Sequence, residues 1–195
     1  YLLFPAMGML IVMATPVFHT LFGSKWDASV ALFQLLLVRG IFTVLTQLYA
    51  NYVLALGNAA MNVKIELLRD GVALAAIFIT LPYIALSWEG DITAGVRIFI
   101  LGQVMASAVA WFATLLIAAK LSKRSWLQYL SDSLPYAMLT LLILIPMYYE
   151  SGLISTPWLL CVVQLATGSG IYLLANFVLG SKVQRDAIAY FRGRN

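Results

Sequence analysis

Charged side chains are scarce in this 195-residue chain. Only 10% of its residues are Asp, Glu, Lys or Arg, whereas 63% are hydrophobic. A soluble domain carries about 25% charged residues, so this chain has too few charges to give a folded body of its size a water-compatible surface. The excess apolar surface must face lipid. This excludes an ordinary soluble enzyme, a disordered tail and a nucleic-acid-binding module.

Cysteine and histidine are almost absent. Cys161 is the single cysteine, so no disulfide can form within the chain, and one histidine, His19, cannot build a multi-histidine metal site. The sequence also lacks paired carboxylates on one helix face at one depth, an Asp-rich metal–phosphate motif and a plausible Ser–His–Asp set. We therefore predict no catalytic residue, no cofactor and no enzymatic activity.

A basic leader segment is missing as well. Tyr1 opens directly into an apolar run over 1–21, without Lys or Arg and without an initiating methionine. A secretory signal starts with a basic region and ends at a small-residue cleavage site. We therefore expect the chain to belong to a longer membrane protein, entered near the start of a membrane span.

Long apolar runs are what the sequence does contain. A helix needs about 20 mostly apolar residues to cross a bilayer, and prolines or glycines inside such a helix are tolerated. Six stretches meet this requirement, so the predicted class is an all-α integral membrane protein. The predicted transmembrane helices lie at about 1–21, 28–56, 63–87, 92–121, 126–149 and 157–179, followed by a tail over 180–195.

Basic residues collect on one side of these predicted spans. Short loops rich in Lys and Arg stay in the cytoplasm, and only Lys25 and Arg97 fall on the side opposite the tail. We therefore predict a multi-pass protein of the cytoplasmic (inner) membrane with a cytoplasmic C-terminus. The basic residues on the tail side are Lys64, Arg69, Lys120, Lys123, Arg124, Lys182, Arg185, Arg192 and Arg194.

Arg39 is a charge placed deep inside a predicted span. It lies roughly 18 Å along the helix that starts near Asp27, which is close to the bilayer middle. A charge at that depth is costly and marks a functional site by default. Because residues four apart share a helix face, the polar stripe continues through three more residues. The predicted substrate-lining residues are Arg39, Thr43, Gln47 and Asn51, with Gln103 on the fourth span as a weaker candidate.

Two interpretations of Arg39 stay open. A guanidinium offers five donors in a planar fork that suits phosphate, so the stripe can line a cavity for an anionic substrate. Alternatively, Arg39 pairs with a carboxylate outside this chain or bonds helix carbonyls for structural reasons. Within the chain we expect no carboxylate at its depth, because Asp132 and Glu66 are predicted near the inner surface and most other acids near the outer one. Glu66, Arg69 and Asp70, in the first turns of span 63–87, are interpreted as a surface charge cluster or, alternatively, as a gate contact to another lobe.

Two stretches resemble a known transporter family. One covers residues 16–28 around the motif Leu-Phe-Gly-x-x-Trp at 21–26, and the other covers residues 49–57 and continues with Lys-Ile-Glu at 64–66. Together they resemble the C-terminal half of the polysaccharide exporters for O-antigen, teichuronic acid or exopolysaccharide. These Wzx-type lipid-linked oligosaccharide flippases are related to the multidrug and toxin extrusion (MATE) transporters within one superfamily, called MOP. The resemblance spans nearly the whole chain.

This resemblance implies a two-lobe, MATE-like flippase in which the chain supplies most of one lobe plus extra C-terminal helices. It implies a polyprenyl-diphosphate-linked oligosaccharide as substrate, moved to the outer leaflet by alternating access. The implied partners are membrane lipids and the N-terminal lobe of the same protein, and no nucleic acid. The resemblance also gives structural roles in an outer turn to Leu21, Phe22, Gly23 and Trp26.

Other functions remain as alternatives. A cation-coupled multidrug or toxin exporter favours buried carboxylates for its coupling ion and its cationic drug. A membrane glycosyltransferase or polymerase subunit, from another class, needs a large outer loop or an acidic cluster. A purely structural scaffold would use Arg39 as a packing device only.

Overall fold

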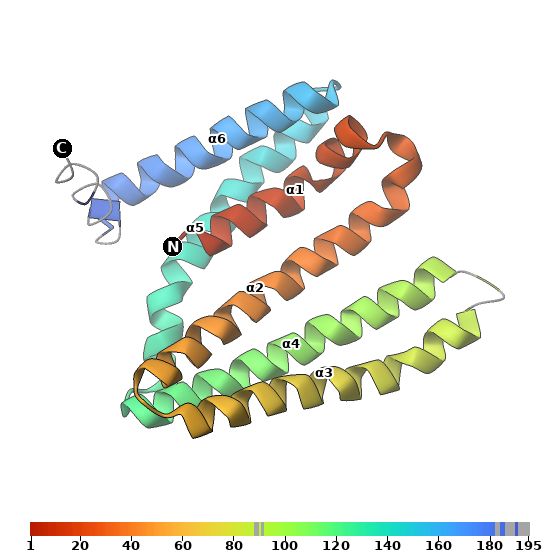
Figure 1. Cartoon of the computed structure of the whole chain (residues 1–195). Coiled ribbons are helices and arrows are strands. Elements are labelled where there is room, and N and C mark those ends of the chain that lie inside the picture. The colour runs from red at the N-terminus through yellow and green to blue at the C-terminus, as the bar shows by residue number, and fades with distance from the viewer. Residues whose placement is uncertain (88–89, 91, 182–183, 186–189, 191–195) are drawn as a thin grey trace. The chain divides into compact units, whose positions relative to one another are not determined.

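The structure is a computed structural model of residues 1–195, and it describes all of them except 88–89, 91, 182–183, 186–189 and 191–195. The described residues form six α-helices and one short 3-10 helix (Figure 1). The predicted tail residues Lys182, Arg192 and Arg194 lie outside the described residues. The elements are α1 (Leu3–Leu21), η1 (Ser24–Trp26), α2 (Asp27–Ala55), α3 (Ala59–Ser87), α4 (Ile92–Ser122), α5 (Trp126–Leu153) and α6 (Pro157–Val178).

All six α-helices are long and apolar enough to cross a membrane. This confirms the predicted all-helical membrane class, and the architecture is that of a multi-pass membrane protein. Two helices extend past the predicted spans: α3 begins at Ala59 rather than at 63, and α5 ends at Leu153 rather than at 149. The earlier start of α3 changes the depth of every residue on that helix.

The chain divides into two compact units. Unit 1 comprises residues 1–27 and 133–195, and unit 2 comprises residues 28–132. Unit 1 therefore holds α1, η1, most of α5 and α6, whereas unit 2 holds α2, α3, α4 and the first turns of α5. Each unit has a hydrophobic core of its own.

In unit 1, α1 packs against α6, and buried contacts join α6 to α5. Gly168 allows a close approach, because a Cβ there would lie 2.6 Å from Met9 Sδ and 2.8 Å from Met147 Sδ. Gln164, which is fully buried, donates to the Met147 carbonyl at 2.8 Å and to Ser151 Oγ at 3.0 Å. The core of unit 1 consists of Met13, Ile143, Met147 and Tyr172.

The turn after α1 contains the four residues to which the family resemblance gives a structural role there. Leu21 is the last residue of α1, and the backbone N–H groups of Phe22 and Gly23 both donate to the Phe18 carbonyl, at 2.8 and 3.2 Å. Gly23 has φ +79° and ψ 173°, a region open almost only to glycine. The Phe22 and Trp26 rings lie 5.8 Å apart. The positive φ of Gly23 thus lets the chain turn after the end of α1, and the two aromatic rings pack against each other at this turn.

Replacing Gly23 with alanine is expected to lower the free energy of unfolding by about 1–3 kcal/mol, because a Cβ strains this backbone conformation. Gly71→Ala is the matched control: Gly71 lies inside α3 with no atom within 4 Å of an added Cβ, so alanine should be neutral or stabilising there. Thermal unfolding of both variants in detergent measures the difference. Equal midpoints for the two variants would contradict the prediction.

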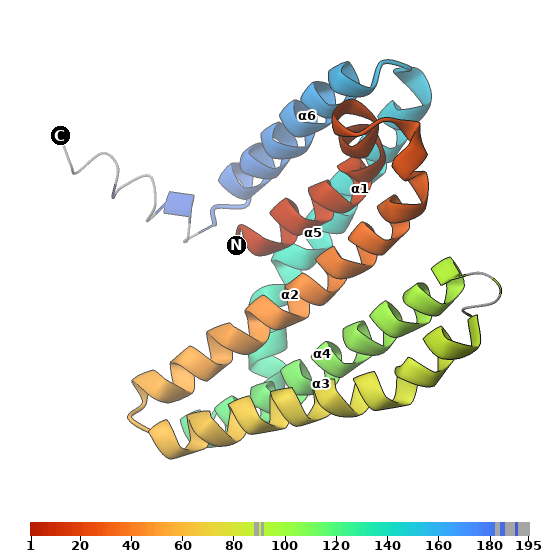
Figure 2. The ribbon, with the colours of Figure 1, turned by 45° about the vertical axis from the view of Figure 1, so that its right-hand side comes forward.

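In unit 2, α3 and α4 lie side by side and antiparallel (Figures 1 and 2). Gly102 on α4 brings the two backbones close, since a Cβ there would lie 2.5 Å from Thr80 Cγ2 on α3. The end of α2 joins this pair through buried side chains near the α2–α3 turn. The core of unit 2 consists of Tyr49, Ala50, Val53, Ile65, Leu115 and Ala118.

Threonine hydroxyls within the helices donate to carbonyls of their own helix. Thr46, Thr114 and Thr140 each bond the carbonyl four residues earlier at 2.8 Å, and all three side chains are buried. An unpaired polar group in lipid or in a dry helix interface costs several kcal/mol. These residues are therefore accommodated without polar partners on other helices.

Candidate functional site

Arg39 lines a small pocket that lies entirely within unit 2. The pocket has a volume of about 110 Å³, enough for several water molecules or one small anion. Small residues on α4 leave the space open, and polar residues on α2 and α3 surround it. The lining consists of Arg39, Thr43 and Thr46 from α2, Arg69, Asp70 and Ala73 from α3, and Ala106, Ser107 and Ala110 from α4.

The pocket lies near the middle of the helices. α2 has 29 residues, about 43 Å at 1.5 Å per residue, and Arg39 lies roughly 18 Å from its start. Ala106 and Ala110 lie near the midpoint of the 31-residue α4. The pocket is thus separated from the α2–α3 turn by the apolar core of unit 2.

The Arg39 guanidinium has unmet hydrogen-bonding capacity. Its Nε atom is buried, and neither a hydrogen bond to this atom nor an ion pair of Arg39 occurs in the described part of the chain. A buried donor without a partner costs about 1–3 kcal/mol, and more when it is charged. The pocket therefore holds a cationic donor that an acceptor of opposite charge would stabilise.

The hydroxyl groups of the pocket direct their protons elsewhere. Thr43 donates to the Arg39 carbonyl at 3.0 Å, and Thr46 donates to a carbonyl of its own helix as described above. Ser107 donates to the Gln103 carbonyl at 2.9 Å. In this arrangement the N–H groups of the two guanidiniums are the donors available to a ligand, because each hydroxyl proton is already used within its helix.

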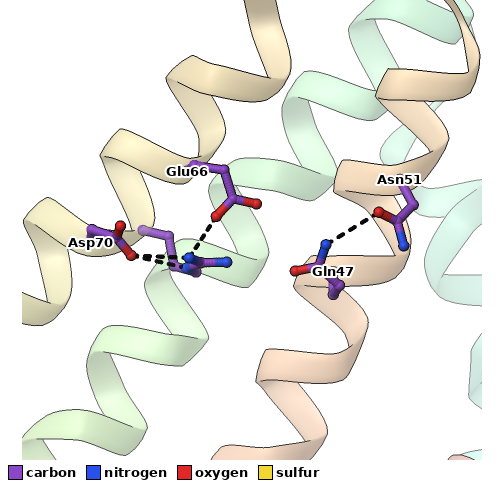
Figure 3. A network of polar contacts seen from close by, with 5 residues as sticks. Gln47, Asn51, Glu66 and Asp70 are labelled. Carbon is purple, nitrogen blue, oxygen red and sulfur yellow. Dashed lines mark hydrogen bonds and ion pairs between the residues drawn. The ribbon is translucent and has the colours of Figure 1, made fainter. Parts of the chain in front are cut away.

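Arg69, the second guanidinium of the pocket, is occupied by carboxylates. Its Nη2 lies 2.5 Å from Glu66 Oε2 and 3.1 Å from Asp70 Oδ1, and its Nε donates to the same Asp70 oxygen at 3.2 Å. Glu66 and Asp70 lie on the same face region of α3, as Figure 3 shows. The pocket thus combines the Arg39 guanidinium, which has no carboxylate partner in the described residues, with the Arg69 guanidinium, whose Nε and Nη2 atoms are paired with carboxylates.

Asp70 overturns one expectation from the sequence. No carboxylate was expected at the depth of Arg39, but Asp70 lines the same pocket. The reason is the start of α3 at Ala59, which places Asp70 about 16 Å along the helix instead of in its first turns. Arg69 and Asp70 are therefore site residues that the sequence interpretation missed. The available signal was a Glu66–Arg69 pair at i,i+3 followed at once by a second acid.

The remaining predicted residues lie near the pocket but not in its lining. Gln47 donates to Asn51 Oδ1 at 3.2 Å, and both side chains are exposed on α2 between the pocket and the α2–α3 turn (Figure 3). Gln103 is buried and donates to the Ala73 carbonyl at 3.4 Å, which ties α4 to α3 beside the pocket. Of the five predicted substrate-lining residues, the structure brings Arg39 and Thr43 together in one pocket.

Comparison with known proteins gives one informative likeness. Over 98% of its length the chain is 22% identical to a Klebsiella pneumoniae protein described as "uncharacterized membrane protein in cps region". The chain spans 38% of the length of that relative. No protein-family model matches the chain, and no solved structure matches it. The description of the relative as a membrane protein agrees with the six long apolar helices.

Proposed function

We propose that the chain is part of a transporter that moves a polyprenyl-diphosphate-linked oligosaccharide across the cytoplasmic membrane for polysaccharide export. The observation that carries this proposal is the buried Arg39 Nε without a partner in the described residues, in a pocket at mid-helix depth that polar, charged and small apolar side chains line. The relative in a cps region, which is a capsular polysaccharide gene region, supports a role in polysaccharide synthesis or export.

The chemistry of the pocket suits the phosphate part of such a substrate. A diphosphate is expensive to move through lipid because it loses its hydration. A guanidinium replaces that hydration with charge-assisted hydrogen bonds in a geometry that fits phosphoryl oxygens. The volume of about 110 Å³ accepts one phosphoryl group, so the sugars occupy space beyond the pocket while the prenyl chain stays in the bilayer. Alternating access in a two-lobe, MATE-like protein would then expose the site to each side in turn.

A cation-coupled multidrug exporter is the second candidate, and Asp70 is the observation that favours it. A carboxylate beside the pocket could hold a coupling ion or a cationic drug. Both nearby carboxylates are already paired with Arg69, however, and the unpaired charge in the pocket is the positive one of Arg39. A cationic ligand would therefore meet repulsion, whereas an anionic ligand would meet a free donor.

Depleting the complete protein from its native cell tests the proposed function. We expect lipid-linked oligosaccharide to accumulate in the cytoplasmic leaflet, because the preceding synthesis continues while transfer across the membrane stops. A lectin that binds the glycan measures its orientation in inside-out and right-side-out membrane vesicles, and re-expression of the protein should restore export. Accumulation on the outer face would indicate a polymerase instead. A change in drug resistance with normal glycan orientation would indicate a drug exporter.

A further inference from the structure

We infer that Glu66 and Asp70 are resident counter-anions, which compete with the phosphoryl group of the substrate for Arg69 and thereby promote its release. The inference deepens the proposed function, on which it rests, by assigning Arg69 as the second cationic ligand of the Arg39 pocket. It also names two carboxylates as determinants of how tightly that pocket holds an anion. It arises from the juxtaposition of a free and an occupied guanidinium in one pocket of about 110 Å³.

The first step of the argument concerns charge. Two guanidiniums and the Asp70 carboxylate line this pocket, and Glu66 contacts Arg69 from outside the lining. The formal charges of these four groups are therefore balanced before any ligand enters. The charges are not paired evenly. Both carboxylates contact Arg69, and neither forms an ion pair with Arg39. An incoming anion therefore finds its first donor at Arg39. A phosphoryl group has several acceptor oxygens, so one guanidinium leaves part of its hydrogen-bonding capacity unused.

The second step concerns the donors of Arg69. Its Nε and Nη2 atoms both contact Asp70 Oδ1, and Nη2 also contacts Glu66 Oε2. A phosphoryl oxygen uses the same donors in the same planar geometry as a carboxylate oxygen. Because Arg39 and Arg69 line one small pocket, a phosphoryl group bound to Arg39 lies within the region that Arg69 can reach. Carboxylate and ligand then compete for one set of N–H groups.

The third step concerns how easily the exchange occurs. The side chains of Arg69, Glu66 and Asp70 are 35%, 32% and 64% exposed. Ion pairs that are only partly buried are held less tightly than fully buried pairs. Arg69 can therefore turn from a carboxylate to the ligand at low cost. After transfer, the carboxylates recapture Arg69, and the ligand loses half of its cationic contacts.

Anion binding to the complete protein in nanodiscs tests the inference. The probes are inorganic pyrophosphate in solution, and polyprenyl diphosphate without sugars in the bilayer, so that a free anion and a lipid headgroup are distinguished. We expect Asp70→Asn and Glu66→Gln each to tighten binding of the lipid probe about tenfold, because a competing charge near the site is removed. Both variants should also export more slowly, since release becomes slower.

Asp132→Asn is the matched control. Asp132 contacts Arg124 at 3.5 Å with 63% exposure, so this variant loses a similar exposed ion pair outside the pocket. We expect its anion affinity to equal that of the unchanged protein. Thermal unfolding of all three variants checks that the fold is intact.

Three results would overturn the inference, and they differ in whether they also reject the anion site of the proposed function. Unchanged or weaker binding in both carboxylate variants, with binding still abolished by Arg39→Gln, rejects the counter-anions but keeps the anion site. Unchanged binding in Arg39→Gln rejects the anion site of the proposed function, and the counter-anion inference with it. Tighter binding of pyrophosphate without any effect on the lipid probe rejects the lipid headgroup as the competing ligand.

Discussion

Under the proposed function, export of the lipid-linked oligosaccharide is expected to fall about 100-fold when Arg39 is replaced by glutamine. Glutamine keeps a polar side chain but removes the positive charge and the donor fork. Truncating one partner of a buried, hydrogen-bonded charge pair costs about 2–5 kcal/mol, and 100-fold corresponds to about 2.7 kcal/mol. The measurement is the initial rate at which the glycan becomes accessible on the outer face, at matched protein levels in the membrane.

Lysine at position 39 should restore part of this loss. It keeps the charge but presents a point charge instead of a planar fork, so we expect its export rate to lie between those of glutamine and arginine. Arg97→Gln is the control for charge loss, because Arg97 is exposed near the start of α4. Normal export with both glutamine and lysine at position 39 would show that the Arg39 stripe serves helix packing only.

Gly102→Ala is expected to destabilise unit 2 by about 2–3 kcal/mol through overpacking. The new Cβ would lie 2.5 Å from Thr80 Cγ2. The Thr80 side chain has little freedom to turn away, because its hydroxyl donates to the Ala76 carbonyl at 2.6 Å. Rotating the methyl group out of the clash would break that bond, so α3 and α4 must move apart instead. Denaturant unfolding in detergent measures the loss.

A second substitution isolates this clash. Thr80→Ser removes the clashing methyl group and keeps the hydroxyl bond, so the double variant with Gly102→Ala should regain about half or more of the lost stability. Gly170→Ala is the control for a helical glycine, since no atom lies within 4 Å of its added Cβ. A double variant no more stable than Gly102→Ala alone would show that another contact causes the destabilisation.

The membrane class was predictable from the sequence because apolar length is a local property. Each helix carries its own apolar run, and the requirement of about 20 residues does not depend on neighbours. The polar face of α2 was predictable for the same reason, since residues four apart share a face. Arg39 and Thr43 therefore meet at the pocket as the helix periodicity indicates.

The position of Asp70 along its helix and the packing of α3 on α4 were not predicted from such local properties. Placing Asp70 requires the start of α3, which the sequence interpretation took from hydropathy alone. It did not use the helix cap at Asn58, whose Oδ1 accepts a hydrogen bond from the Met61 N–H at 3.0 Å. The packing of α3 on α4 depends on Gly102 meeting Thr80, and nothing in either sequence segment marks the other as its partner. The pairing of Arg69 with Glu66 and Asp70 is local to α3 and could be predicted, whereas the place of Arg69 and Asp70 beside Arg39 depends on how the helices pack and emerged from the structure.

The threonine hydroxyls that bond their own helix bear on how the protein enters the membrane. A segment leaving the insertion machinery meets lipid before it meets its neighbours, so any donor that waits for another helix raises the cost of entry. Thr46, Thr114 and Thr140 bring no such cost, because each bond closes within a single turn. Arg39 does add to the free energy of membrane insertion, by about 2.5–3.5 kcal/mol for a charge near a helix centre. The apolar residues of α2 must offset that cost, which ties the presence of the Arg39 charge to the hydrophobicity of the helix that carries it.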